Sequence, residues 1–145
     1  MAHREWYKTI QHINQWTIKN GYLLPLIADI LDGVGKRKVF MKLDLRWGYN
    51  NVRIKEEDEW KAVFMIYIGV YEPTVMYFGL TNSPTTFQAM MNDLFRDLIN
   101  QGDTATFIDN ILVATDTKEG HNELVKEVLR RLEENDLFVK PEKCK

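Results

Sequence analysis

The stretch TFIDNILV, residues 106–113, constrains the fold of this chain more than any other. Apolar residues flank a short polar pair, Asp109 and Asn110, as in two strands joined by a tight hairpin. Asp and Asn tolerate the left-handed backbone that a two-residue hairpin loop requires. The pattern therefore predicts a hairpin with Asp109 at its tip. Two interpretations stay open here: a carboxylate presented for metal binding, or turn chemistry with no further role.

A further strand is predicted where apolar residues alternate at period two, in residues 39–45 (VFMKLDL). One face of this strand carries only aliphatic and methionine side chains: Val39, Met41, Leu43 and Leu45. The other face carries Phe40, Lys42 and Asp44. Successive side chains of a strand point to opposite faces of the sheet. Asp44 therefore points away from the side that the aliphatic residues bury.

Two amphipathic helices are predicted on either side of the hairpin. Residues 82–84 (NSP) are typical of a helix start, since a capping side chain precedes a proline whose missing N–H is harmless. That helix carries an apolar stripe at helical spacing and ends at Gly102. Asp116 or Thr117 is the expected cap of the second helix, whose apolar stripe lies within residues 124–132.

The remaining apolar segments complete an α+β chain. We expect a short helix over residues 24–32, and strands at 52–54, twice within 62–80 with a turn near 69–73, and at 138–139. This order of elements implies an antiparallel sheet with two long helices on one face. Asp44 and Asp109 would then meet on the face that these helices leave uncovered.

Composition narrows the class of protein. A chain of 145 residues with 45% hydrophobic content fits one domain. Its net charge of −2 gives no overall positive field, so any nucleic-acid binding must come from local patches. The single cysteine, Cys144, excludes an internal disulfide framework. No apolar run approaches the roughly 20 residues that span a bilayer, and we expect a soluble intracellular protein with no membrane partner.

Two carboxylates on one sheet surface suggest a metal site. They repel each other unless a cation lies between them, and hard oxygen ligands select Mg²⁺ or Mn²⁺. Paired ions of this kind carry out in-line phosphoryl transfer. Two aspartates in one domain are commonplace, however, so spacing alone leaves a structural role for Asp44 and Asp109 open.

Several blocks of the sequence, in consistent order, resemble the palm of gypsy-type LTR-retrotransposon reverse transcriptases. They read KLDLRWGYNNVRIKEEDEWKAVF (42–64), VMYFGLTNSPTTFQAMMND (75–93), FIDNILVATDTKEGH (107–121) and RLEENDLFVKPEKC (131–144), and WTIKNGYLLPLIADILD (16–32) extends the resemblance. The resemblance implies one domain, with an RRM-like βαββαβ palm over 39–51 and 79–145. Fingers-like parts would lie at about 1–38 and 52–78. We expect the thumb and RNase H regions to be absent.

The resemblance also implies an activity and its residues. An RNA-directed DNA polymerase transfers dNTPs to a primer 3′-hydroxyl on an RNA or DNA template, using two divalent ions. Asp44 and Asp109 would be catalytic metal ligands, joined by the backbone carbonyl of Leu45. The nucleotide site would use the backbone N–H groups of Trp47 and Gly48 at the triphosphate, Tyr49 against a ribose 2′-hydroxyl, and Phe78 and Gly79 along the nucleotide and template.

The sequence departs from the family at places that matter for catalysis. Asn110 stands at the third acidic position of the Tyr-x-Asp-Asp turn, and Phe107 replaces its tyrosine. Glu5 falls near a position where the family has an arginine that grips the triphosphate, and apolar residues 65–68 replace basic fingers residues. We therefore expect impaired catalysis and weak binding of Mg²⁺ or Mn²⁺. The apolar residues 63–71 are a candidate self-association surface.

Other classes of function remain open at this stage. The chain is alternatively a non-catalytic remnant, or a module that binds protein or nucleic acid through an RRM-like sheet. RNA binding is the weaker form of this alternative, because the aromatic strand signature that stacks bases is missing. An unrelated metal-dependent nuclease is less favoured, since no His or Glu cluster accompanies the aspartates.

Overall fold

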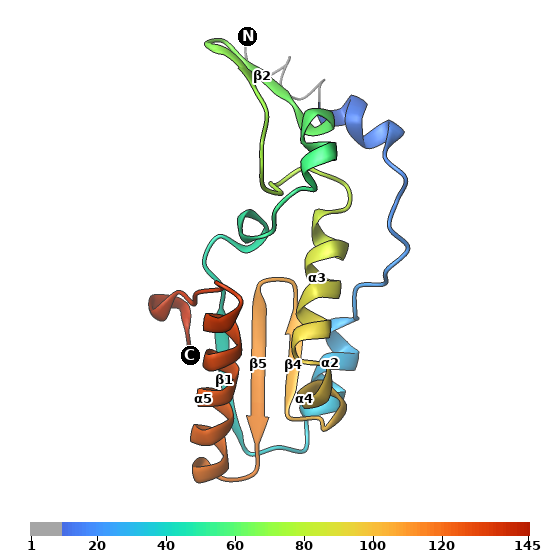
Figure 1. Cartoon of the computed structure of the whole chain (residues 1–145). Coiled ribbons are helices and arrows are strands. Elements are labelled where there is room, and N and C mark those ends of the chain that lie inside the picture. The colour runs from blue at the N-terminus through green and yellow to red at the C-terminus, as the bar shows by residue number, and fades with distance from the viewer. Residues whose placement is uncertain (1–9) are drawn as a thin grey trace.

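The computed structural model describes residues 10–145 and contains two antiparallel sheets (Figure 1). The larger sheet has the strand order β1-β5-β4 and is formed by β1 (Val39–Asp44), β4 (Thr104–Phe107) and β5 (Asn110–Thr115). The smaller sheet pairs β2 (Phe64–Ile66) with β3 (Gly69–Tyr71) at the far end of the molecule. The mixed helix and sheet class predicted from the sequence is confirmed.

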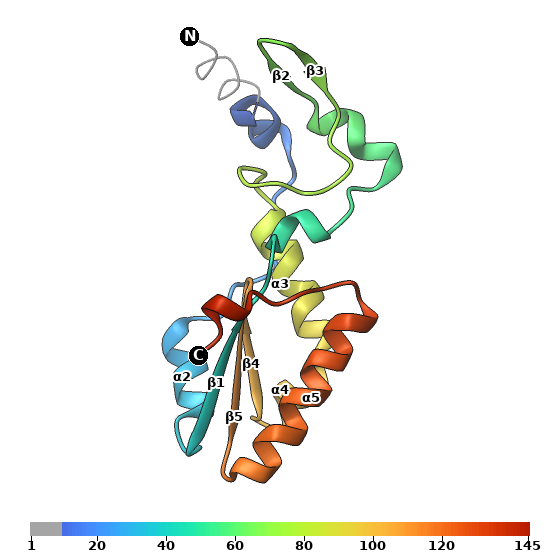
Figure 2. The same cartoon turned by 90° about the vertical axis from the view of Figure 1, so that its left-hand side faces the viewer.

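Helices lie on both sides of the larger sheet (Figure 2). One side carries α3 (Ser83–Leu94), α4 (Arg96–Asn100) and α5 (Lys118–Glu134). The predicted first long helix is interrupted at Phe95, whose backbone is not helical. The other side carries α2 (Ile27–Val34), which contacts β4. The face that the two long helices leave uncovered thus carries the shorter helix α2.

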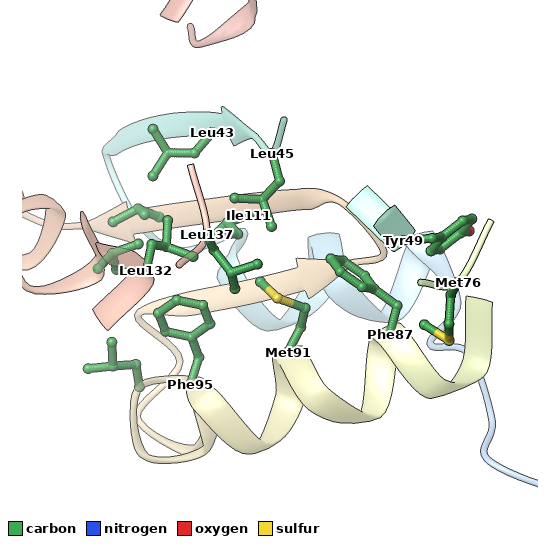
Figure 3. Close-up of a cluster of buried hydrophobic side chains, with 13 residues drawn as sticks. Leu43, Leu45, Tyr49, Met76, Phe87, Met91, Phe95, Ile111, Leu132 and Leu137 are labelled. Atoms are coloured by element: carbon green, nitrogen blue, oxygen red, sulfur yellow. The ribbon is translucent and has the colours of Figure 1, made fainter. Parts of the chain in front are cut away.

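The main core lies between the larger sheet and α3 and α5 (Figure 3). Leu43 of β1 is paired with Ile111 of β5, so both side chains face the helices. The helices contribute the buried residues Phe87, Met91, Val128 and Leu132, and the junction between α3 and α4 contributes Phe95. Burying one large apolar side chain stabilises a fold by about 1.5–3 kcal/mol. This cluster fixes which face of each strand points inward.

The starts of the two long helices differ from each other. Thr117 caps α5, because its side-chain oxygen accepts a hydrogen bond from the Gly120 N–H at 3.2 Å. The expected cap by Asn82 is wrong, although Asn82 does occupy the N-cap position of α3. Its side chain instead accepts from the Asn20 N–H at 3.0 Å and donates to the Ile18 carbonyl at 2.9 Å. Asn82 thus ties the N-terminal segment to the start of α3.

Four of the predicted strands are shorter or displaced. The strands expected at 52–54 and 138–139 are reduced to single bridges, Arg53 with Val75 and Leu45 with Val139. The hairpin of β2 and β3 turns at residues 67–68, before the expected 69–73, because Gly69 already pairs with β2. Within residues 10–145, none of the helices is both long and apolar enough to cross a membrane.

The C-terminal residues return along the outer edge of β1. The Lys140 N–H donates to the Asp44 carbonyl at 2.8 Å, and Lys42 and Lys145 exchange backbone hydrogen bonds at 2.7 and 3.0 Å. An unpaired strand edge is a template for unwanted pairing, and this return covers it. The same return places residues 138–140 beside the end of β1 where Asp44 lies.

Candidate active site

The hairpin between β4 and β5 turns on two residues, Ile108 and Asp109, since Phe107 and Asn110 are paired partners. Ile108 is the left-handed residue, with φ 54°, and Asp109 has no positive φ. This pattern matches a type II′ turn, in which only the first central residue has φ above zero. The prediction that Asp and Asn supply the left-handed backbone is therefore wrong. A β-branched residue there costs about 1–3 kcal/mol.

Gln88 of α3 holds this strained turn in place. Its Oε1 accepts a hydrogen bond from the Ile108 N–H at 2.7 Å. Its Nε2 donates to the Thr106 carbonyl at 3.1 Å and the Thr106 hydroxyl at 2.9 Å, and also to Asn92 Oδ1 at 2.8 Å. The Gln88 side chain is fully buried, so these bonds are shielded from water. The turn that carries Asp109 is thus anchored to the core helix.

The end of β1 lies directly beside the turn. The Leu45 N–H donates to the Asp109 carbonyl at 2.8 Å, and Asp44 is the paired partner of Asn110. Paired residues share a face, so the side chains of Asp44 and Asn110 lie on the side of the sheet opposite the main core. Gly48 also approaches, because a Cβ at that position would lie 3.6 Å from the Asp109 Cβ. The structure therefore brings together the three positions that the sequence singled out.

Polar and charged groups surround Asp44 closely. Asp44 is only 8% exposed, and its Oδ1 lies 3.3 Å from the Lys140 ammonium. Asn110 donates from Nδ2 to Asp109 Oδ1 at 3.2 Å. In place of the uncovered surface expected there, Asp44 is thus nearly buried, with Lys140 of the C-terminal return beside it.

The donor set suits a hard divalent cation. Within residues 10–145 no group of three or more His, Cys, Asp or Glu side chains is arranged to hold a metal ion, since the third position here is Asn110. Two buried oxygens of this site, Asp44 Oδ1 and Asn110 Oδ1, nevertheless lack a hydrogen-bond partner among residues 10–145. Carboxylate and amide oxygens are ligands that such cations accept. The residues fit a metal ion, with one negative charge fewer than three carboxylates would supply.

The backbone reverses sharply just after β1. Trp47 and Gly48 both have left-handed φ values, 63° and 36°, and Gly48 opens the 3-10 helix η1 (Gly48–Asn51). The Trp47 ring is 64% exposed, with the Arg46 guanidinium 4.6 Å from its centroid. This reversal places residues 47 and 48 next to the Asp109 turn.

Tyr49 and Phe78 form an aromatic pair, with their rings tilted by 60°. Tyr49 is buried, with ring centroids 4.9 Å from Phe78 and 5.7 Å from Phe87 (Figure 3 shows Tyr49 and Phe87). Burial, and then the charge of Asp109, raise the pKa of the Tyr49 hydroxyl. Phe78 is 71% exposed, so it is the ring that faces solvent.

Gly79 adopts φ 107° and is held by the N-terminal helical residues. Asn14 donates from Nδ2 to the Gly79 carbonyl at 2.7 Å, and its Oδ1 accepts from the Thr81 N–H at 2.9 Å. A Cβ at Gly79 would lie 3.4 Å from the Ile10 side chain, which leaves little room for a larger residue. The loop after Phe78 is therefore fixed by contacts from far along the chain. The sequence-predicted Glu5 lies outside the described residues.

Sequence reasoning missed Asn14, Gln88 and Lys140. A signal for Gln88 was present, because an amide inside the apolar stripe of a helix is a polar group at a buried position. Asn14 and Lys140 carry no such signal, since each acts on a residue distant in sequence.

Comparisons with known proteins point to one family. The family model described as reverse transcriptase (RNA-dependent DNA polymerase) matches residues 4–145. The chain is 32% identical over 132 residues to the Transposon Tf2-7 polyprotein of Schizosaccharomyces pombe, and 35% identical over 133 residues to Polyprotein P3 of Commelina yellow mottle virus. These matches cover 91% and 92% of this chain but only 10% and 7% of the two polyproteins.

Solved structures share the fold. The foamy viral protease-reverse transcriptase in complex with an RNA/DNA hybrid matches with a TM-score of 0.84 at 22% identity, over 92% of this chain and 18% of that one. The foamy viral protease-reverse transcriptase dRH in complex with double-stranded DNA matches with a TM-score of 0.85 at 22% identity, over 94% of this chain and 24% of that one. The arrangement of strands and helices is therefore shared with these enzymes.

Proposed function

The chain belongs to the reverse transcriptase (RNA-dependent DNA polymerase) family, and from this premise we propose that it is a polymerase palm with part of the fingers. Residues 39–51 and 79–145 form the palm and about 1–38 and 52–78 the fingers-like parts. Its reaction is RNA-directed transfer of dNTPs to a primer 3′-hydroxyl. The observation that carries the proposal is the meeting of Asp44, at the end of β1, with the Asp109–Asn110 turn.

Asp44, Asp109 and the backbone carbonyl of Leu45 would hold Mg²⁺ or Mn²⁺. Ions of this type, when bound, activate the attacking hydroxyl and neutralise the leaving pyrophosphate. The chain's own contribution is placement, because the Leu45–Asp109 backbone hydrogen bond and the Gln88 network fix the two aspartates on one scaffold. The Asp44 carboxylate and the Asn110 Oδ1, which has no hydrogen-bond partner among residues 10–145, support a cation there.

The nucleotide would lie along the Tyr49–Phe78 aromatic pair next to this site. Phe78 presents an exposed ring for the base or sugar, and Tyr49 packs against Phe78 from the buried side, where its ring is proposed to exclude a ribose 2′-hydroxyl. The backbone N–H groups of Trp47 and Gly48 are proposed to meet the triphosphate, and Gly79 the template side. The template-primer would be RNA or DNA, as the nucleic-acid complexes of the foamy viral enzymes suggest.

Asn110 is the reason to propose impaired catalysis and weak metal binding. An asparagine keeps the shape of an aspartate but gives up its charge. Two unit charges about 4 Å apart interact by roughly 4 kcal/mol at an effective dielectric of about 20. Since about 1.4 kcal/mol is tenfold in rate, losing a carboxylate that touches the metal in the transition state removes several decades of activity.

Primer extension on a poly(rA) template with Mn²⁺ tests the proposal. Asn110→Asp should raise the rate at least about 100-fold, because the missing charge returns to the metal site. Asn100→Asp is the matched control, since Asn100 is exposed at the end of α4 and far along the chain from the turn. Asp44→Asn should abolish the gain. An Asn110→Asp variant that binds Mn²⁺ but extends no faster than the control contradicts the polymerase assignment.

Self-association is a second proposal, supported by the exposed hairpin of β2 and β3. Met65, Tyr67, Ile68 and Val70 are 53%, 87%, 61% and 61% exposed, although all four are apolar or aromatic. Such a patch is typical of a protein contact surface. Sedimentation across a concentration series checks this, and Val70→Lys should shift the chain to monomer. A monomer at every concentration contradicts it.

A further inference from the structure

The ammonium group of Lys140 lies next to the first aspartate of the proposed metal site. Its Nζ is 3.3 Å from Asp44 Oδ1, and that buried oxygen accepts no hydrogen bond from residues 10–145. The Lys140 side chain is 26% exposed and that of Asp44 12%. This ion pair is thus partly withdrawn from water, where it is screened less than a surface pair.

The backbone holds Lys140 in this position. Its N–H donates to the Asp44 carbonyl at 2.8 Å, and just before it Val139 bridges to Leu45. The Arg46 N–H donates to the Phe138 carbonyl at 2.7 Å, which continues the pairing. Exposed ion pairs between flexible side chains contribute little, partly because both side chains must be ordered. Here the backbone pairing already holds Lys140 beside Asp44, so less conformational entropy is lost when the ion pair forms.

The charges of the site indicate that this contact affects cation binding. Asp44 and Asp109 supply two negative charges, Asn110 supplies none, and Lys140 supplies one positive charge. We propose that Lys140 is the internal counter-ion of Asp44 and sets the metal affinity of the site, so that a divalent cation binds by displacing the lysine ammonium. This inference rests on the proposed function, because it takes Asp44 as a metal ligand.

The lysine contact acts in the same direction as Asn110. Asn110 lowers the attraction of the site for a cation by removing a charge, and Lys140 lowers it further by occupying the space beside Asp44. In the metal-free site the Lys140 ammonium lies against Asp44, and the Asn110 amide donates to Asp109 Oδ1. A cation has to break the first of these contacts to reach Asp44.

Mn²⁺ titration followed by electron paramagnetic resonance tests the proposal without nucleotide or nucleic acid. Lys140→Met should bind Mn²⁺ about tenfold more tightly, since a methionine retains the apolar stem but cannot neutralise Asp44. Lys140→Arg should match the wild type, because the positive charge stays. Lys143→Met is the matched control: Lys143 lies exposed in η3 (Pro141–Lys143), and its ammonium forms no ion pair among residues 10–145.

The outcomes separate this inference from the proposed function. If Asp44→Asn weakens Mn²⁺ binding while Lys140→Met binds no more tightly than Lys143→Met, the lysine role is overturned and the metal site stands. If Asp44→Asn binds Mn²⁺ as well as the wild type, both are overturned. Lys140→Gln serves as a second, polar replacement with the same expected gain, and its backbone N–H can still pair with Asp44. Thermal melts of all variants confirm that the compared proteins are folded.

Discussion

Replacing Gln88 with methionine is the sharpest test of how the turn that carries Asp109 is held. Methionine has a similar volume and length, so Gln88→Met keeps the packing of α3 but removes every polar contact of the side chain. Ile108 N–H loses its acceptor at 2.7 Å, and the Thr106 carbonyl loses a donor at 3.1 Å. Ile108 keeps its left-handed backbone only as long as the surroundings enforce it.

The expected cost follows from these contacts. A buried hydrogen bond contributes about 0.5–1.5 kcal/mol, and a buried polar group left unpaired costs about 1–3 kcal/mol. For a fully buried glutamine whose loss leaves the Ile108 N–H unpaired, the free energy of unfolding should fall by about 3–5 kcal/mol. Total stabilities of about 5–15 kcal/mol make this a large fraction.

Urea denaturation followed by circular dichroism measures the effect. With a slope of about 1–3 kcal/mol per molar urea, the midpoint should fall by roughly 1–5 M. Gln101→Met is the control, since Gln101 is exposed just after α4, and its midpoint should stay near that of the wild type. Equal midpoints for the two variants refute the claim that Gln88 anchors the turn.

Two more predictions concern charge and backbone. Hydrogen bonds from Arg131 hold the pKa of Asp97 at about 2, so this carboxylate stabilises the fold above its ordinary pKa of 3.8. That stability should be lost as the pH falls from about 4 towards 2, and Arg131→Met should flatten the dependence in denaturation series at each pH. Gly48→Ala should cost about 1 kcal/mol, because φ is 36° while the new Cβ makes only an ordinary contact. Gly33→Ala, within α2 and with open space around it, should stabilise the fold by up to about 1 kcal/mol. If the urea midpoints of Gly48→Ala and Gly33→Ala move in the same direction, this pair of predictions is contradicted.

The elements that sequence predicted best are those whose burial repeats regularly. Period-two alternation gave β1 with the correct inward face, and helical spacing gave the stripes of α3 and α5. The strands expected at 52–54 and 138–139 failed, because a strand needs a partner and only one bridge forms at each. Local pattern cannot tell whether a distant segment will supply such a partner.

The sequence predicted the acidic positions of the site, but not the polar side chains that contact it or the segments around it. Asp44 and Asp109 stand at strand ends that the pattern itself locates. Asn82 has the chemistry of a cap, yet it bonds residues 18–20, because a side chain takes whichever partner the tertiary fold brings near. Lys140 likewise contacts Asp44 only because the C-terminal residues pair with the edge of β1.

The hydrogen bonds that hold the turn indicate which property of the site Asn110 changes. The backbone of the turn is fixed by Gln88 at Ile108 and by Leu45 at the Asp109 carbonyl, and neither bond involves the Asn110 side chain. The amide at position 110 therefore affects charge far more than shape. A metal-free Asn110→Asp variant should lose about 1 kcal/mol of stability from repulsion among carboxylates. Mn²⁺ should restore that loss, because a ligand that binds only the folded chain stabilises it; a loss that Mn²⁺ leaves unchanged means that Asn110 is needed for the shape of the turn.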